Sequence, residues 1–142
     1  MSRVINTDST GKKRNQNMRT GAELLRRLSQ KTTRDDEAND MVAQLVYCLR
    51  EIDEGIDQSA RAWEKRDYWM KAEEFRQRWH WVGDMADQLR TLVFNDDWDR
   101  LPAVMIKLLP YFSEIKVNKY MRKAGSWEGC YQRLLREKPP AR

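Results

Sequence analysis

A stretch without proline, residues 33–95, constrains the fold of this chain more than any other feature. Apolar residues recur there every three or four positions, in two successive stripes. The first stripe is Met41, Leu45, Leu49, Ile52, Ile56, Ala60 and Trp63, and the second is Tyr68, Ala72, Phe75, Trp79, Val82, Ala86, Leu89 and Val93. This is the period of an amphipathic α-helix and not the two-residue alternation of a strand. The stretch therefore predicts an all-α fold.

The two stripes fit either one long rod or a pair of antiparallel helices. A single rod of about 60 residues would be roughly 90 Å long at 1.5 Å per residue and would need a partner along its whole length. A hairpin buries both stripes within one domain, so we expect the hairpin. Its first helix should be capped by Thr33, its turn should lie at 65–67, and its second helix should end at 95–97.

Further helices are expected before and after this hairpin. Thr20 and Glu23 have the spacing of a capping box, so we expect a helix to begin at Thr20 or, with Gly21 tolerated inside it, to extend back to about Thr10. Pro102 suits the first turn of a helix after the hairpin, and Pro110 must kink or restart that helix. Gly125 and Ser126 are typical of a helix stop and the cap of a last short helix.

Together these signals predict a bundle of four to five helices built on a long central antiparallel hairpin. The bundle domain should span residues 20–137. It should be preceded by a basic, polar N-terminal arm at 1–19 and followed by a C-terminal tail at 138–142.

Several common classes of protein are disfavoured by composition. No run approaches the roughly 18 to 20 apolar residues of a membrane helix, and the N-terminus lacks the apolar core of a signal peptide. Cys48 and Cys130 are isolated and do not form a CxxC pair. We therefore expect reduced, structural thiols in a cytoplasmic protein that does not bind membranes.

Charge is strongly segregated along the chain, whose net charge is +5. Residues 1–34 carry nine Lys and Arg against two Asp and Glu, and residues 101–142 carry nine against three. The centre is acidic. The basic ends either pack on the acidic central helices or form a surface that contacts RNA, DNA or an acidic partner. The candidate contacts are Lys12, Lys13, Arg14, Arg19, Arg26 and Arg27 near the N-terminus, and Lys116, Lys119, Arg122 and Lys123, expected on a shared helix face, near the C-terminus.

The second helix of the hairpin has an additional apolar shoulder. On a helical wheel Trp81 lies more than about 100° from the main stripe, together with Met70, Met85 and Leu92. A helix that is apolar on two sides is either central in its domain or half of an oligomer contact. Trp beside Arg can also stack on the bases of single-stranded nucleic acid. These four residues are the candidate interface of a homo-oligomer or with a protein partner.

Signals for catalysis are few. The single histidine, His80, excludes paired-histidine metal sites, and no Gly-rich phosphate loop or Gly-x-Ser-x-Gly elbow is present. Glu51 and Glu54 are spaced to share a divalent ion if a second helix supplied more ligands, but a solvated acidic face is the simpler interpretation. We expect no metal, no cofactor and no small-molecule substrate.

Three functions therefore follow from the sequence. The favoured one is a non-enzymatic binding or adaptor protein whose basic ends contact nucleic acid or an acidic partner. The second is a structural homo-oligomeric assembly subunit that acts through Trp81 and Met85. The third, a metal-dependent enzyme that uses Glu51 and Glu54, is the remotest.

Overall fold

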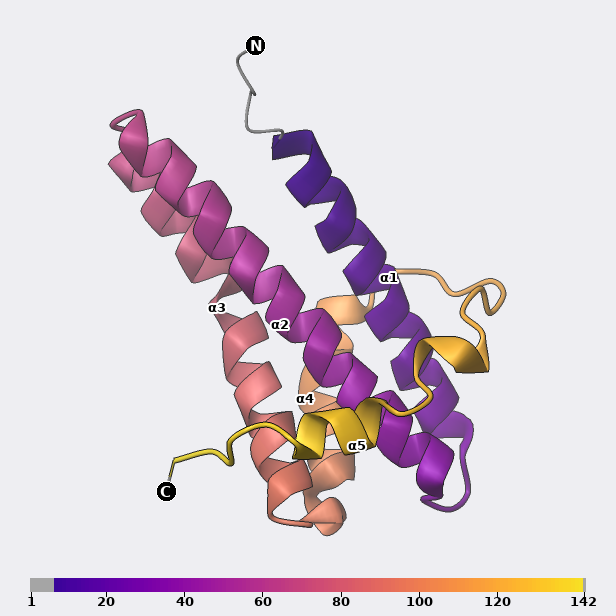
Figure 1. Cartoon of the computed structure of the whole chain (residues 1–142). Helices are drawn as coiled ribbons and strands as arrows, with labels where there is room; N and C mark the ends of the chain where they lie inside the picture. Colours follow the sequence, from indigo (N-terminus) through magenta and orange to yellow (C-terminus); the bar gives the residue numbers. More distant parts are fainter. Residues whose placement is uncertain (1–6, 142) are drawn as a thin grey trace.

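The computed structural model describes the chain from residue 7 to residue 141. Over this range it contains helices and loops and no strand, so the predicted all-α bundle is confirmed (Figure 1). The α-helices are α1 (Thr7–Gln30), α2 (Asp36–Lys65), α3 (Trp69–Phe94), α4 (Leu101–Phe112) and α5 (Cys130–Leu135), with short 3-10 helices η1 (Trp98–Arg100) and η2 (Ala124–Ser126).

Helices α2 and α3 form the predicted antiparallel hairpin (Figure 1). The turn between them is a Schellman motif in which Asp67 takes the left-handed conformation, with φ of 64°. The Tyr68 N–H donates to the Trp63 carbonyl at 2.9 Å, and the Asp67 N–H donates to the Glu64 carbonyl at 3.0 Å. Glycine usually occupies this position. Because an aspartate does so here, the sequence carried no clear stop signal between the two stripes.

The start of α2 differs by two residues from the prediction. Asp35, not Thr33, is the N-cap, since its carboxylate accepts a hydrogen bond from the Ala38 N–H at 2.8 Å. The Lys31 ammonium lies 3.0 Å from Asp35 and 2.9 Å from Glu37. These contacts hold the loop that joins α1 to α2.

Helix α1 follows the longer of the two predicted alternatives and begins three residues before Thr10. It begins at Thr7, so residues 7–19 are helical and do not form an arm; the rest of the predicted arm, residues 1–6, lies outside the described residues. The capping box at Thr20 is also wrong. The Thr20 hydroxyl donates to the Gln16 carbonyl at 2.9 Å, one turn back, which places it inside the helix. Gly21 allows close packing here, since a Cβ on it would lie 2.7 Å from the Phe112 ring.

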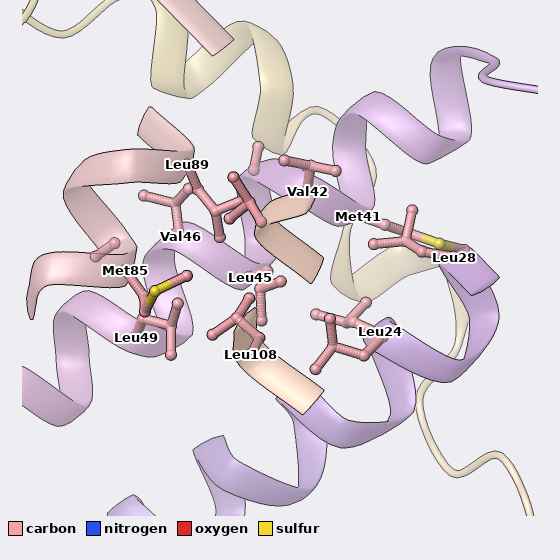
Figure 2. Close-up of a cluster of buried hydrophobic side chains, with 14 of the residues drawn as sticks. Leu24, Leu28, Met41, Val42, Leu45, Val46, Leu49, Met85, Leu89 and Leu108 are labelled. Carbon is pink, nitrogen blue, oxygen red and sulfur yellow. The ribbon is translucent and has the colours of Figure 1, made fainter. Parts of the chain in front are cut away.

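The core is centred on α2, which packs against α1, α3 and α5. Figure 2 shows buried side chains from α1, α2, α3 and α4 converging in one cluster. The residues labelled there are Leu24, Leu28, Met41, Val42, Leu45, Val46, Leu49, Met85, Leu89 and Leu108. All the aliphatic residues of the first predicted stripe, from Met41 to Ala60, are buried.

The predicted shoulder on α3 is covered within the chain. Met85 and Leu92 are each 4% exposed, and Trp81 stacks on Tyr111 of α4 with ring centroids 4.0 Å apart. The expectation that these residues form an intermolecular interface is therefore wrong for Met85 and Leu92. Of these four residues, only Met70, which lies beside the hairpin turn and is 79% exposed, remains largely accessible to solvent. A helical wheel identifies an apolar side but cannot show which element covers it.

The chain after α4 also departs from the prediction. Pro110 lies inside the last turn of α4, and the helix ends at Phe112 without restarting. Residues 115–123 have no helical structure. Lys116, Lys119, Arg122 and Lys123 therefore do not share a helix face. The last helix starts at Cys130, after Gly129 with φ of 79°, and not directly after Ser126.

Glu137 joins the end of the chain to the hairpin. Its carboxylate accepts two hydrogen bonds from Arg50 of α2, at 2.9 and 3.0 Å, and one from Arg90 of α3, at 3.2 Å. The hydrogen bonds from Arg50 are the main reason that the pKa of Glu137 lies below its ordinary value. Arg90 also donates to the carbonyl of Lys138, the first residue of the predicted tail, so the start of the tail is held against the bundle.

Replacing Glu137 with Gln should lower the free energy of unfolding near neutral pH by about 0.5–1 kcal/mol, the range for largely solvated ion pairs. Because the folded-state pKa is depressed, the carboxylate stabilises the fold above its ordinary pKa of 4.5, and this contribution is lost as the pH falls through the folded-state value. Urea unfolding across this pH range measures the effect. The stabilities of the two proteins should converge in acid, and Glu128→Gln, at an exposed position, should behave as the wild type. A difference that does not depend on pH would contradict the assignment.

Candidate functional site

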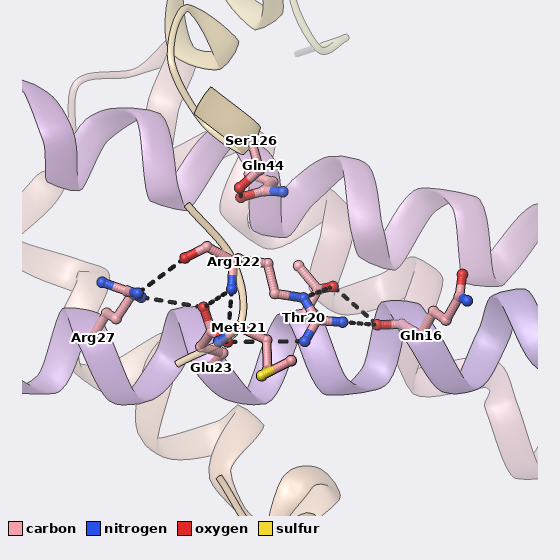
Figure 3. Close-up of polar contacts among 8 residues, drawn as sticks. All are labelled: Gln16, Thr20, Glu23, Arg27, Gln44, Met121, Arg122 and Ser126. Atoms are coloured by element: carbon pink, nitrogen blue, oxygen red, sulfur yellow. Dashed lines mark hydrogen bonds and ion pairs between the residues drawn. The ribbon is translucent and has the colours of Figure 1, made fainter. Parts of the chain in front are cut away.

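A buried carboxylate organises the basic part of the molecule. Glu23 of α1 is 2% exposed. It accepts backbone hydrogen bonds from the Met121 N–H at 2.7 Å and the Arg122 N–H at 3.0 Å. The Arg27 Nε also donates to it, at 3.2 Å, and an Arg122 Nη1 lies 3.8 Å away (Figure 3). Removing a carboxylate from water is costly. It is tolerated here because each of the two oxygens accepts hydrogen bonds.

Three of the predicted contact arginines hold residues 117–122 against α1. The Arg122 guanidinium donates to the Thr20 hydroxyl at 2.9 Å and to the Gln16 carbonyl at 3.3 Å (Figure 3). Arg27 donates to the Arg122 carbonyl at 3.0 Å, and Arg26 donates to the Val117 carbonyl at 2.6 Å. These guanidinium groups therefore have partners inside the protein, a role that the sequence pattern did not reveal.

Arg27 is further held by aromatic rings. Its guanidinium lies 4.0 Å from the centroid of Tyr120 and 5.0 Å from that of Trp127, within the range of cation–π contacts. Trp127 is buried and belongs to the core cluster. Residues 116–123, which we call the basic segment, are thus attached to α1 by an ion pair, by backbone hydrogen bonds and by stacking.

This attachment brings the two basic ends of the chain together. Lys12 and Arg19 lie one turn on either side of Gln16, on the side of α1 that contacts residues 117–122. Lys116, Lys119 and Lys123 belong to the segment itself and are exposed, as are Lys12 and Arg19. We call these five residues the basic surface. The sequence predicted two patches, and the structure holds the segment that carries the second against the helix that carries the first.

The alternative that the basic ends pair with the acidic centre is not supported for the ten candidate residues. Only Arg27 and Arg122 lie within 4.0 Å of a described carboxylate, and in both cases it is Glu23. None of the ten pairs with a carboxylate of α2 or α3 within the described part of the chain. The charges of the basic surface are therefore available to solvent.

Lys13 and Arg14 have a different location from the other candidates. They line a cleft of 510 Å³ between α1 and α2, which Glu51 and Glu54 also line. Arg14 is half-buried, with its guanidinium 5.4 Å from the ring centroids of both Phe75 and Trp79. The carboxylate pair considered as metal ligands thus faces cations across a cleft.

The two thiols lie in the core. Cys48 and Cys130 are free and buried. Burial, followed by the charge of Glu51, raises the pKa of Cys48 to about 12, and burial also raises the pKa of Cys130. Both remain protonated at neutral pH and so are poor nucleophiles. The sequence predicted reduced, structural thiols, and both cysteines are free and buried.

Helix α4 exposes apolar side chains on its outer side. Ile106 is 66% exposed and Leu109 is 50% exposed. With Leu101 and Met105 they line an apolar groove of 480 Å³ that extends to Leu28 of α1. The sequence of α4 is rich in apolar residues. A helical wheel of one helix cannot show which of its sides the other helices leave exposed.

Replacing Glu23 with Ala should detach the basic segment from α1. It removes the acceptor for two backbone N–H groups and for Arg27, which should lower the free energy of unfolding by about 3 kcal/mol. Amide hydrogen exchange should accelerate at Met121 and Arg122. The control is Glu114→Ala, at an exposed position. Unchanged exchange in folded Glu23→Ala would contradict the role of Glu23.

Over the described residues, no group of three or more His, Cys, Asp and Glu side chains is arranged to hold a metal ion. Within the same range, every helix is too short or too polar to cross a lipid bilayer. Comparisons of the chain with protein-family models, with curated proteins and with solved structures find no match.

Proposed function

We propose that this chain is a non-enzymatic helical protein that binds nucleic acid through the phosphate contacts of its basic surface. The observation that supports the proposal is that the segment with Lys116, Lys119 and Lys123 is held against α1, the helix that carries Lys12 and Arg19. All five are exposed and lack an ion pair among the described residues. Such clustering is typical of a surface that neutralises phosphates.

The residue types favour nucleic acid over an acidic protein. Four of the five cations are lysines, which are depleted from protein interfaces but suit phosphate as point charges. Residues 115–123 contain no acidic side chain that would repel phosphate. Because the exposed groups are flexible cations rather than a rigid base-reading array, the expected binding is electrostatic and independent of sequence.

Fluorescence anisotropy with labelled single- and double-stranded oligonucleotides tests this function. Binding should be measurable at ~50 mM salt and should weaken steeply by ~200 mM. The triple variant Lys116→Gln, Lys119→Gln, Lys123→Gln should bind more weakly, and its slope of log affinity against log salt on duplex DNA should fall in magnitude by about three.

The control is Lys65→Gln, Arg66→Gln, Lys71→Gln, which removes the same charge from exposed positions around the hairpin turn. It should retain binding. No binding at ~50 mM salt, or equal losses in both triple variants, would overturn the proposal. Binding to a poly-glutamate peptide but not to oligonucleotides would assign the surface to an acidic protein instead.

Self-assembly is a second candidate function, favoured by the outer side of α4. A short helix that is apolar on nearly every side is ordinarily buried, and Lys107 is the only charged residue in α4. Ile106 and Leu109 project from the side that no described element covers. A second copy of the chain that packs its own α4 there would bury both surfaces at once.

Sedimentation equilibrium measures this assembly directly. The wild type should show a mass above the 17.0 kDa of one chain, and Ile106→Asp should return it to that value because a charge cannot be buried in an apolar contact. Lys107→Gln, at the adjacent exposed position, is the control and should assemble as the wild type. A wild type that sediments as a monomer at ~100 μM would exclude assembly through α4, since the dissociation constant of a stable interface lies well below this concentration.

A further inference from the structure

The cleft between α1 and α2 is lined by charged side chains of both signs. Lys13 and Arg14 line it from α1, and Glu51 and Glu54 line it from α2. The helices approach each other closely at one point, where a Cβ on Gly55 would lie 3.1 Å from the Thr10 methyl group. The cleft is therefore bounded by two packed helices, and its 510 Å³ lies within the usual range of small-molecule sites.

The opposing charges do not satisfy one another. Among the described residues, no carboxylate lies within 4.0 Å of Lys13 or Arg14, and no cation lies within 4.0 Å of Glu51 or Glu54. Two further cations line the cleft, Arg50 of α2 and Arg133 of α5. Arg50 is paired with Glu137 at 2.9 Å, and the Arg133 guanidinium lies 4.5 Å from the centroid of the Tyr47 ring. The cleft thus presents two cations from α1 and two carboxylates from α2 that have no ion pair among the described residues.

Arg14 is the most informative of these groups. It lies on the core-facing side of α1, one turn before the buried Met18. Partial burial lowers its pKa, and among the described residues no carboxylate within 4.0 Å offsets that cost. Its guanidinium lies 5.4 Å from the ring centroids of both Phe75 and Trp79, within the range of cation–π contacts. A guanidinium held in this way is preorganised to accept an anion from outside the chain.

We propose that this cleft binds a small molecule that carries an anionic group, of the phosphate type, and an amine on a short linker. Lys13 and Arg14 would bind the anion, and Glu51 and Glu54 would bind the amine. A ligand with only the anion or only the amine would leave the charged groups of one helix without a partner. A nucleic-acid backbone fits poorly here because Glu51 and Glu54 would face its phosphates. The cleft therefore differs in ligand from the basic surface, although Lys13 and Glu51 also line a neighbouring pocket with Arg19.

Calorimetric titration with O-phosphoethanolamine, inorganic phosphate and ethanolamine tests the proposal. O-phosphoethanolamine should bind at least about tenfold more tightly than inorganic phosphate, the gain expected from one additional charge-assisted contact. Ethanolamine should bind most weakly. Equal affinities for O-phosphoethanolamine and inorganic phosphate, or no binding of either, would overturn the proposal, because the charged walls would then be merely solvated.

Variants of each wall sharpen the test. Glu54→Gln should reduce the affinity for O-phosphoethanolamine to that for inorganic phosphate, whereas Lys13→Gln should weaken both. Lys12→Gln removes the same charge one residue away, outside the cleft, and should change neither. An equal effect of Lys12→Gln would show a diffuse charge effect and overturn the site. Comparison with vesicles containing phosphatidylethanolamine decides the source: binding of the soluble compound alone supports a free ligand, and binding of both supports access to a lipid headgroup.

Discussion

The position of the basic segment depends on the burial of one carboxylate, that of Glu23. Removing an ion from water is costly, and here two backbone N–H groups and the guanidinium groups of Arg27 and Arg122 offset that cost. The same contacts hold a loop that has no regular hydrogen-bonding pattern of its own. Because the loop is fixed on α1, Lys119 and Lys123, which precede and follow Arg122, are held near the helix that carries Lys12 and Arg19.

The structure divides the ten candidate cations among three roles. Arg26, Arg27 and Arg122 are attached to internal acceptors and stabilise the fold. Lys13 and Arg14 line the cleft opposite Glu51 and Glu54. The exposed lysines and Arg19 remain for solvent or for phosphate. Net charge alone cannot separate these roles, since each depends on whether an acceptor lies within hydrogen-bonding distance.

Prediction from the sequence succeeded where periodicity was the relevant signal and failed where a local motif had two possible partners. The stripes through Leu45 and Leu89 gave the correct helices and core. Thr20 and Glu23 match a capping box, yet Glu23 binds a segment about a hundred residues away instead of the helix start. Likewise Asp67 ends α2 in a conformation that glycine prefers, so the residue type alone did not mark the turn.

By itself the sequence determined the all-α class, the hairpin and the face of α2 that is buried, because helical periodicity and apolar burial act locally along one helix. Only the tertiary structure decided that Met85 and Leu92 are buried within the chain, that the segment around Arg122 is bound to α1, and that Arg14 lines a cleft without an ion-pair partner among the described residues. Those outcomes depend on contacts between residues far apart in the chain. No periodicity within a single segment encodes which distant group will supply a donor, a ring or a covering helix.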